Sequence, residues 1–141
     1  MYSYKYPRAA LTVDAIVYCK DKSTASVLLI ERGHAPFQYK WALPGGFIEM
    51  DETLEQACIR ELEEETGLKV DTMQQFKAYD AIDRDPRHRT ISVVFSVQLD
   101  KKVAVEGNDD AIKAAWFSID ALPELAFDHA EILKDFFEQH G

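Results

Sequence analysis

Several features are scarce in this 141-residue sequence, and each scarcity narrows the class of protein. There are two cysteines, Cys19 and Cys58, far apart in the chain, so we expect buried free thiols in a reducing compartment rather than a disulfide framework. No apolar run approaches the roughly 20 residues of a membrane-spanning helix, and the first residues lack the apolar segment of a signal peptide. Glycine and proline are few, and we find no linker, repeat or low-complexity segment. We therefore expect one domain, residues 1–141, in the cytoplasm and without a membrane partner.

Positive charge is also in short supply. The chain has 16 lysines and arginines against 25 aspartates and glutamates, for a net charge of −9. Eight acids and one base lie within residues 49–65, so the acidity is concentrated in one segment. Long nucleic acid requires a broad basic surface and is not an expected partner. A small anionic substrate can still bind through a metal ion and local arginines.

The acidic segment contains three glutamates with helical spacing. Glu61, Glu64 and Glu65 stand at i, i+3 and i+4, within roughly 100° of one helix face. Like charges repel there, and the last turn before Gly67 is the negative end of the helix dipole. Carboxylate oxygens suit Mg²⁺ or Mn²⁺, so a divalent cation would turn this repulsion into coordination. A solvated acidic helix end is the alternative interpretation.

The ends of this helix can be predicted from local signals. Thr53 and Gln56 form a capping-box pattern, and Gly67 is a natural stop. The apolar side of the helix is formed by Leu54, Cys58 and Leu62. Glu65 falls close to that side, so we expect it to be partly sheltered from water.

The segment resembles the Nudix box at every defining position. Gly46 is followed after five residues by Glu52, and after seven more by the run Arg-Glu-Leu-Glu-Glu-Glu-Thr-Gly-Leu of residues 60–68. The preceding Leu-Pro-Gly-Gly, residues 43–46, is expected to form a turn and is also usual in that family. The resemblance implies an α/β fold, a Nudix-type α/β/α sandwich with a mixed β-sheet. It also implies a Mg²⁺-dependent (or Mn²⁺-dependent) hydrolase of a nucleoside diphosphate linked to another moiety.

The resemblance assigns roles within the box. Glu61, Glu64 and Glu65 are the expected metal ligands, with Gly46 bringing backbone groups near the metal and the phosphates. The expected catalytic residues are Glu61, Glu64, Arg60 and Glu52. Glu61 is also expected to serve as base or water-positioner, and Arg60 is expected to orient Glu52. An ordinary surface ion pair between Arg60 and Glu52 is the alternative interpretation.

Related enzymes often take their general base from a loop outside the box. The candidates in this sequence are Glu106, Asp109 and Asp110, which lie in a loop before Trp116. Each of them is otherwise a simple turn acid.

The expected substrate-binding residues are arginines outside the box: Arg32, Arg84, Arg87 and Arg89. A solvated basic loop is the alternative for the last three. The string of residues 83–87, with Pro86 after the box, and Ala-Phe-Asp-His at residues 126–129 resemble the ADP-ribose pyrophosphatase branch. ADP-ribose, cleaved to AMP and ribose 5-phosphate, is therefore the leading substrate, and the resemblance leaves a homodimer open.

Other functions remain open at this stage. Within the enzyme class these are hydrolysis of 8-oxo nucleoside triphosphates, NADH or dinucleoside polyphosphates. A non-catalytic nucleotide sensor is a second class, although sensors in this family carry an additional DNA-binding region and little chain follows the last expected helix. An acidic interaction surface is a third.

The coarse pattern consists of strands around two helices. Alternating or continuous apolar residues predict strands at residues 10–18, 26–31, 41–43, 73–78, 90–99 and 114–118, the first two forming a hairpin. Asp128 is the expected N-cap of a final helix. Phe37 and Tyr39 are candidates to stack on a base, whereas Trp41 is expected in the core. His129 is expected to be a helix-start residue, and the other histidines are expected on the surface.

Overall fold

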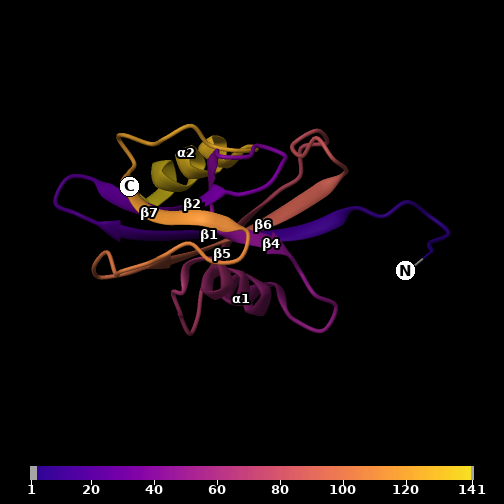
Figure 1. Ribbon diagram of the computed structural model, residues 1–141, viewed down its shortest axis with the longest axis horizontal. Helices are drawn as coiled ribbons and strands as arrows, with labels where there is room; N and C mark the ends of the chain where they lie inside the picture. The colour runs from indigo at the N-terminus through magenta and orange to yellow at the C-terminus, as the bar shows by residue number, and fades with distance from the viewer. Residues whose placement is uncertain (1–2, 141) are drawn as a thin grey trace.

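The computed structural model describes residues 3–140, in which two helices lie on opposite faces of a mixed sheet (Figure 1). The elements are β1 (Ala10–Lys20), β2 (Ala25–Arg32), β3 (Trp41–Ala42), β4 (Gly45–Phe47), α1 (Leu54–Thr66), β5 (Gln74–Tyr79), β6 (Thr90–Gln98), β7 (Ala111–Ser118) and α2 (His129–His140). The predicted α/β/α sandwich with a mixed sheet is confirmed. Within residues 3–140, no helix is long and apolar enough to cross a membrane.

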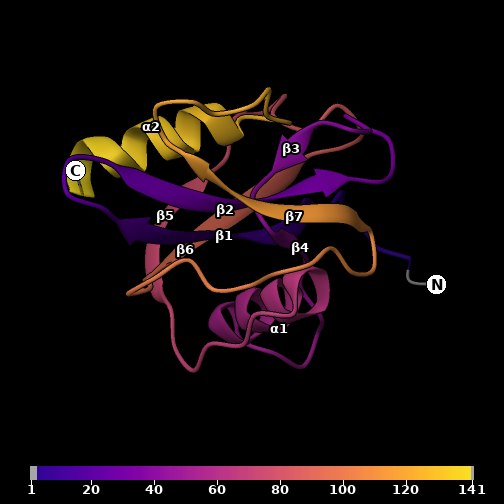
Figure 2. The same ribbon diagram turned by 60° about the vertical axis from the view of Figure 1, so that its left-hand side comes forward.

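The sheet is built around a parallel pair. β1 and β6 run parallel from Ala10 opposite Thr90 to Tyr18 opposite Gln98, and β5 and β2 flank this pair in the order β3-β2-β1-β6-β5. β7 pairs with β2 and β4 pairs with β1 (Figure 2). β6 is a buried central strand because side chains of both its faces enter a core.

Each face of the sheet carries its own apolar core. Under α1 the core contains Val13, Val17 and Leu62, and under α2 it contains Ile16, Leu29 and Phe136. The alternation of Val13, Ile16 and Val17 between the two cores follows from the strand period of two. Strands buried on both faces hold the site residues on a rigid frame.

The hydrogen bonding of β1 changes partner along its length. Near its end, Tyr18 to Lys20 pair with β2, whereas Thr12 to Asp14 pair with β4. β2 pairs with β7 from Ser26 to Arg32 and with β3 at Ile30 and Glu31. We call this end of the sheet, where β1 pairs with β4 rather than β2, the sheet opening.

Three local predictions differ from the structure. Residues 45–46 were expected in a turn but belong to β4, because a glycine at position 45 lets the strand lie directly against the carbonyl of Val13 and the side chain of Asp14. Asp128 precedes α2 as expected, but its carboxylate binds Arg84 rather than capping the helix. A buried guanidinium is the stronger partner for that carboxylate. β7 also begins three residues earlier than predicted, at Ala111.

Candidate functional site

A cavity of about 460 Å³ lies at the sheet opening. α1 contributes carboxylates to its lining, while β2 and the segment before β6 contribute guanidinium groups. The charged residues that line it are Asp14, Arg32, Glu49, Arg60, Glu61, Glu65, Arg84, Asp85, Arg87 and Asp110. A cavity of this size and mixed charge suits a small anionic ligand.

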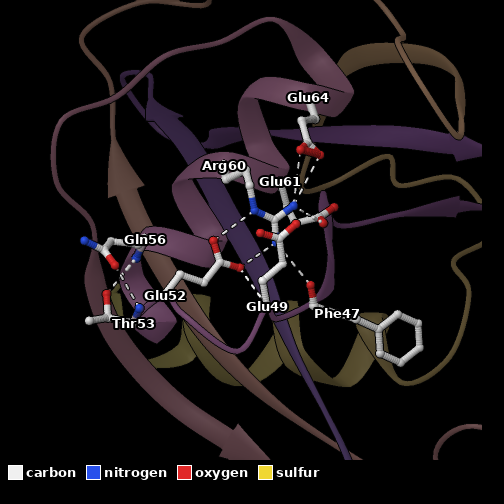
Figure 3. A network of polar contacts seen from close by, with 8 residues as sticks. All are labelled: Phe47, Glu49, Glu52, Thr53, Gln56, Arg60, Glu61 and Glu64. Carbon is white, nitrogen blue, oxygen red and sulfur yellow. Dashed lines mark hydrogen bonds and ion pairs between the residues drawn. The ribbon is translucent and has the colours of Figure 1, made fainter. Parts of the chain in front are cut away.

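Local interactions fix α1 as the sequence predicted (Figure 3). The Thr53 hydroxyl accepts the Gln56 amide at 3.1 Å, and the Gln56 side chain accepts the Thr53 amide at 2.9 Å. Gly67 ends the helix with a φ of 76°, which glycine adopts without strain. The helix therefore presents Glu61 and Glu65 to the cavity in a defined register.

Arg60 holds three glutamates at once (Figure 3). Its guanidinium donates two bonds to Glu52, at 2.6 and 2.9 Å, so the predicted pair is present. It also donates to Glu61 at 2.8 Å and to Glu64 at 3.2 Å. The Arg60 hydrogen bond lowers the pKa of Glu52, and the glutamates together raise the pKa of Arg60. In this arrangement Arg60 supplies the positive charge that three neighbouring carboxylates require.

Glu65 is the most sheltered acid of the box. It is 7% exposed, and its Oε1 accepts the backbone N–H of Gly45 at 2.8 Å. Burial raises the pKa of Glu65 to about 8, and the charges of Glu61 and Asp14 act in the same direction against the Gly45 hydrogen bond. A cation beside this carboxylate would reverse the effect, because opposite charge favours the ionised form.

Gly46 and Glu61 lie in close contact. A Cβ atom at position 46 would come within 2.6 Å of Glu61 Oε2, so only glycine leaves room for the carboxylate in this position. Burial also raises the pKa of Glu61, while Arg60 opposes that shift. The backbone of β4 and the carboxylate of α1 thus share one small space in the cavity.

These residues fit a hard divalent cation by the chemistry of their donors. Glu61 and Glu65 supply partly desolvated carboxylate oxygens beside the backbone at Gly46. Within residues 3–140, no three acidic, histidine or cysteine side chains converge on one point as they stand. In the network around Arg60, the guanidinium binds both Glu61 and Glu64. Glu64 itself is 43% exposed and lies outside the cavity lining.

The four predicted substrate arginines lie in different surroundings. Arg32 stacks on the Phe127 ring at 4.9 Å, and burial and then the charge of Arg87 lower its pKa. Arg87 lines the cavity and pairs with Asp85 at 2.8 Å.

Arg84 and Arg89 mainly bind protein groups. Arg84 lines the cavity but is buried in a two-bond pair with Asp128, at 2.6 and 2.9 Å. Arg89 does not line the cavity and donates to the Asp80 carbonyl at 2.7 Å. Arg32 and Arg87 are therefore the arginines whose positions suit a ligand.

One of the three general-base candidates reaches the cavity. Asp110 lines it and lies 3.2 Å from His34 Nε2. Glu106 and Asp109 are exposed and lie outside the lining. Their loop is nevertheless tied to α1, because the Asn108 amide donates to the Glu65 carbonyl at 3.0 Å.

Sequence reasoning did not assign three polar residues beside the cavity. Asp14 and His129 line it, and the Ser92 hydroxyl donates to Asp14. A signal for Asp14 was available, since an acid interrupts the continuous apolar run of β1. His129 does begin α2 as expected, but it is also buried, which its position at a helix start did not indicate.

The aromatic residues considered for base stacking lie apart from the charged groups. Trp41 packs on Phe117 at 4.8 Å between ring centroids, as predicted for a core residue. Phe37 packs on Phe127, and Tyr39 is exposed, and neither lines the cavity. Phe127 and Phe47 are the aromatic residues in its lining.

Comparison with known families decides the assignment. A model of the NUDIX domain matches residues 9–136. This chain belongs to the Nudix family. The Nudix chain is 42% identical over 131 residues to an ADP-ribose pyrophosphatase from Methanocaldococcus jannaschii, covering 93% of this chain and 75% of that protein.

A second relative of the Nudix chain is a regulator. It is the ADPR responsive transcriptional repressor NtrR from Acinetobacter baylyi, 32% identical over 136 residues. The match covers 94% of this chain and about half, 54%, of that protein. Proteins with quite different names therefore share this domain.

Solved structures resemble the Nudix chain over nearly its whole length. The NUDIX domain of Shewanella oneidensis NrtR, complexed with ADP ribose, gives a TM-score of 0.89 at 29% identity and covers 99% of this chain and 94% of that one. A bifunctional NMN adenylyltransferase/ADP ribose pyrophosphatase from Francisella tularensis, complexed with AMP and manganese, gives 0.86 at 33% identity. That match covers 98% of this chain and 44% of that one.

Proposed function

We propose that this Nudix chain hydrolyses the pyrophosphate bond of a nucleoside diphosphate linked to another moiety, with ADP-ribose as the leading substrate. The observation that carries the proposal is the cavity of mixed charge, lined by Glu61 and Glu65 from α1 and by Arg32 and Arg87. The 42% identity to an ADP-ribose pyrophosphatase supports the choice of substrate. The products would be AMP and ribose 5-phosphate.

A divalent cation, Mg²⁺ or Mn²⁺, would neutralise the pyrophosphate and make water a better nucleophile at neutral pH. Glu61, Glu64 and Glu65 would hold it together with the backbone at Gly46. Glu65 keeps one oxygen on the Gly45 amide, which leaves its other oxygen available. Arg60 would keep its two hydrogen bonds to Glu52, which hold the N-terminal end of α1 in place.

Other residues would bind the substrate and move a proton. Arg32 and Arg87 would bind phosphate oxygens, since guanidinium groups match their geometry. Water adds to one phosphorus while the bridging P–O bond breaks, and the leaving phosphate keeps the electron pair. Asp110, which lines the cavity, is our preferred acceptor of the proton from water, with Glu61, Glu106 and Asp109 as alternatives.

An ADP-ribose sensor without turnover is the second candidate. Its support is the TM-score of 0.89 to the NrtR domain complexed with ADP ribose. The complete set of box glutamates favours turnover, because binding alone does not require a buried, ionisable carboxylate such as Glu65.

Product analysis distinguishes the two. The protein would be incubated with ADP-ribose, NADH, a dinucleoside polyphosphate and an 8-oxo nucleoside triphosphate, with Mg²⁺ and with or without chelator. We expect AMP and ribose 5-phosphate from ADP-ribose only when Mg²⁺ is free. Tight ADP-ribose binding with no products would contradict hydrolysis and support the sensor.

The remaining sequence predictions belong to the same proposal. We propose that residues 1–141 act as one Nudix domain, that the partner is a small nucleotide rather than nucleic acid, and that the compartment is the cytoplasm. The buried free thiols of Cys19 and Cys58 support a reducing environment. Sedimentation or light scattering tests whether the protein forms a homodimer.

A further inference from the structure

The loop that carries the box glycines is held by three different elements. This glycine loop, residues 43–46, follows β3 and includes the first two residues of β4. Its Pro44 carbonyl accepts the Ala15 amide of β1 at 2.8 Å, and its Gly45 amide donates to Glu65 of α1 at 2.8 Å. The third attachment is a histidine from the far end of the chain.

His129, the first residue of α2, accepts the Leu43 amide on its Nδ1 atom at 3.0 Å. The side chain is 3% exposed, and burial lowers its pKa, which favours the neutral ring. Because a backbone amide can only donate, Nδ1 must be the unprotonated nitrogen and Nε2 must carry the hydrogen. Nε2 lies 3.7 Å from Asp14 Oδ1, so the carboxylate favours this tautomer through its charge rather than through a direct bond.

The position of His129 is itself fixed by its neighbours. Asp128 receives two bonds from the buried guanidinium of Arg84, and the Ser92 hydroxyl holds Asp14. Phe127 has a φ of 53°, so the chain turns sharply just before the helix. The turn of residues 126–129 is thereby held by Arg84 at Asp128, and the fixed Asp14 carboxylate lies beside the His129 ring. This accounts for Arg84 and for the Ala-Phe-Asp-His string, which the cavity chemistry leaves unexplained.

We infer that His129 is a positioning residue for hydrolysis: its neutral imidazole holds the glycine loop so that Gly45 binds Glu65 and Gly46 faces Glu61. His129 does not act on substrate in this scheme. It fixes the backbone against which the two glutamates are placed, and a shift of about 1 Å in such a group can cost roughly 100-fold in rate. The expected effect of His129 on the rate rests on the proposed hydrolysis. The hydrogen bond between His129 and Leu43 rests on the structure alone.

Two substitutions distinguish the role of the Nδ1 acceptor of His129 from that of the rest of its ring. His129→Asn places an amide oxygen near the position of Nδ1 and keeps an acceptor for Leu43. His129→Gln places its amide near Nε2 and leaves the Leu43 amide without a partner. Phe137→Leu is the matched control, because it shortens a side chain in the same helix that packs on Tyr18 and Phe136, away from the loop.

The kinetic test compares kcat and KM for ADP-ribose with Mg²⁺ in the four proteins. We expect His129→Gln to lower kcat roughly 10- to 100-fold with KM within about threefold, and His129→Asn to restore kcat to within about threefold of wild type. Phe137→Leu should lower the Tm without lowering kcat. A wild-type kcat in His129→Gln, or equal losses in the Asn and Gln variants, overturns the inference.

Amide hydrogen exchange tests the hydrogen bond between Leu43 and His129 without any measurement of hydrolysis. The Leu43 amide should be protected in wild type and in His129→Asn and should exchange faster in His129→Gln, while Phe137→Leu leaves it unchanged. Nitrogen NMR of the wild-type ring should find Nδ1 unprotonated, and a proton on Nδ1 overturns the inference even if a variant does not fold. Absence of ADP-ribose hydrolysis by wild type, with the Leu43 result as expected, counts against the proposed function alone.

Discussion

At the scale of single residues, Glu65 combines two opposing requirements. It is buried, which disfavours its charge, and it lies beside Glu61 and Asp14, which disfavour it further. A carboxylate in such surroundings is costly for a protein that only needs to fold. The buried position of Glu65 is explained if a cation binds its carboxylate in the working enzyme.

We expect Glu65→Gln to reduce Mg²⁺-dependent hydrolysis by at least about 100-fold, because the variant loses a charged metal ligand. The Gly45 amide keeps an oxygen acceptor, so the fold should be retained. Initial rates with ADP-ribose measure the loss. Glu63→Gln is the control, since Glu63 is exposed in the same turn and should keep wild-type activity. Equal activity in the two variants would remove Glu65 from the metal site.

The same variant tests the pKa of Glu65 in metal-free protein. The folded-state pKa, about 8, lies above the ordinary value of 4.5, so the stability that depends on the bound proton is fully present below pH 4.5. It is lost as the pH rises through 8. Glutamine does not ionise. The free energy of unfolding of Glu65→Gln, relative to that of wild type, should therefore rise by about 2–4 kcal/mol between pH 5 and pH 8. Denaturant unfolding with chelator present measures the difference, and parallel pH profiles would contradict it.

At the scale of elements, α1 and β4 build the site by touching each other. β4 is a three-residue strand, and Gly46 in its middle leaves the space that the Glu61 carboxylate occupies. The capping box holds the opposite end of α1 and contacts nothing in the cavity. Changes at the contact between Gly46 and Glu61 should therefore affect catalysis, whereas changes at the capping box should affect stability.

Gly46→Ala should lower kcat by roughly 10- to 100-fold, because the added methyl group would lie 2.6 Å from Glu61 Oε2 and must displace it. Thr53→Ala is the contrasting change. It should lower the free energy of unfolding by about 1 kcal/mol and leave kcat unaltered. Kinetics and denaturant unfolding on both variants check this. A Gly46→Ala enzyme with wild-type kcat would show that Glu61 has other room to move.

Local elements were predictable from sequence, and long-range contacts were not. Thr53, Gln56 and Gly67 define α1 through bonds between near neighbours, so their pattern is readable directly. The Leu43 bond to His129 spans 86 residues and the Ser92 bond to Asp14 spans 78. No local pattern encodes either contact. β4 was missed for the same reason, since its Leu-Pro-Gly-Gly reads as a turn until β1 is beside it.

At the scale of the whole molecule, the charge distribution predicts how the protein responds to metal. The chain carries a net charge of −9, and buried carboxylates face the cavity. A ligand that binds only the folded state raises stability according to its concentration and affinity.

We therefore expect Mg²⁺ or Mn²⁺ to raise the Tm of the wild-type protein, and excess chelator to reverse the change. At 100 times the Kd, the gain is about 2.7 kcal/mol. The same titration on Glu65→Gln should give a much smaller shift, whereas an equal shift would place the cation elsewhere. Thermal unfolding at constant ionic strength separates this effect from general screening.

The sheet opening also bears on how such a protein changes over evolutionary time. The floor of the cavity belongs to paired strands, whereas Arg32, Arg87 and Asp110 stand at strand ends or on connecting segments. Replacing the connecting segments leaves the backbone ladder of β1 with β6 and of β1 with β4 intact. One hydrolytic centre can thus be inherited unchanged while the surrounding connections are exchanged, and new specificities can arise without rebuilding the scaffold.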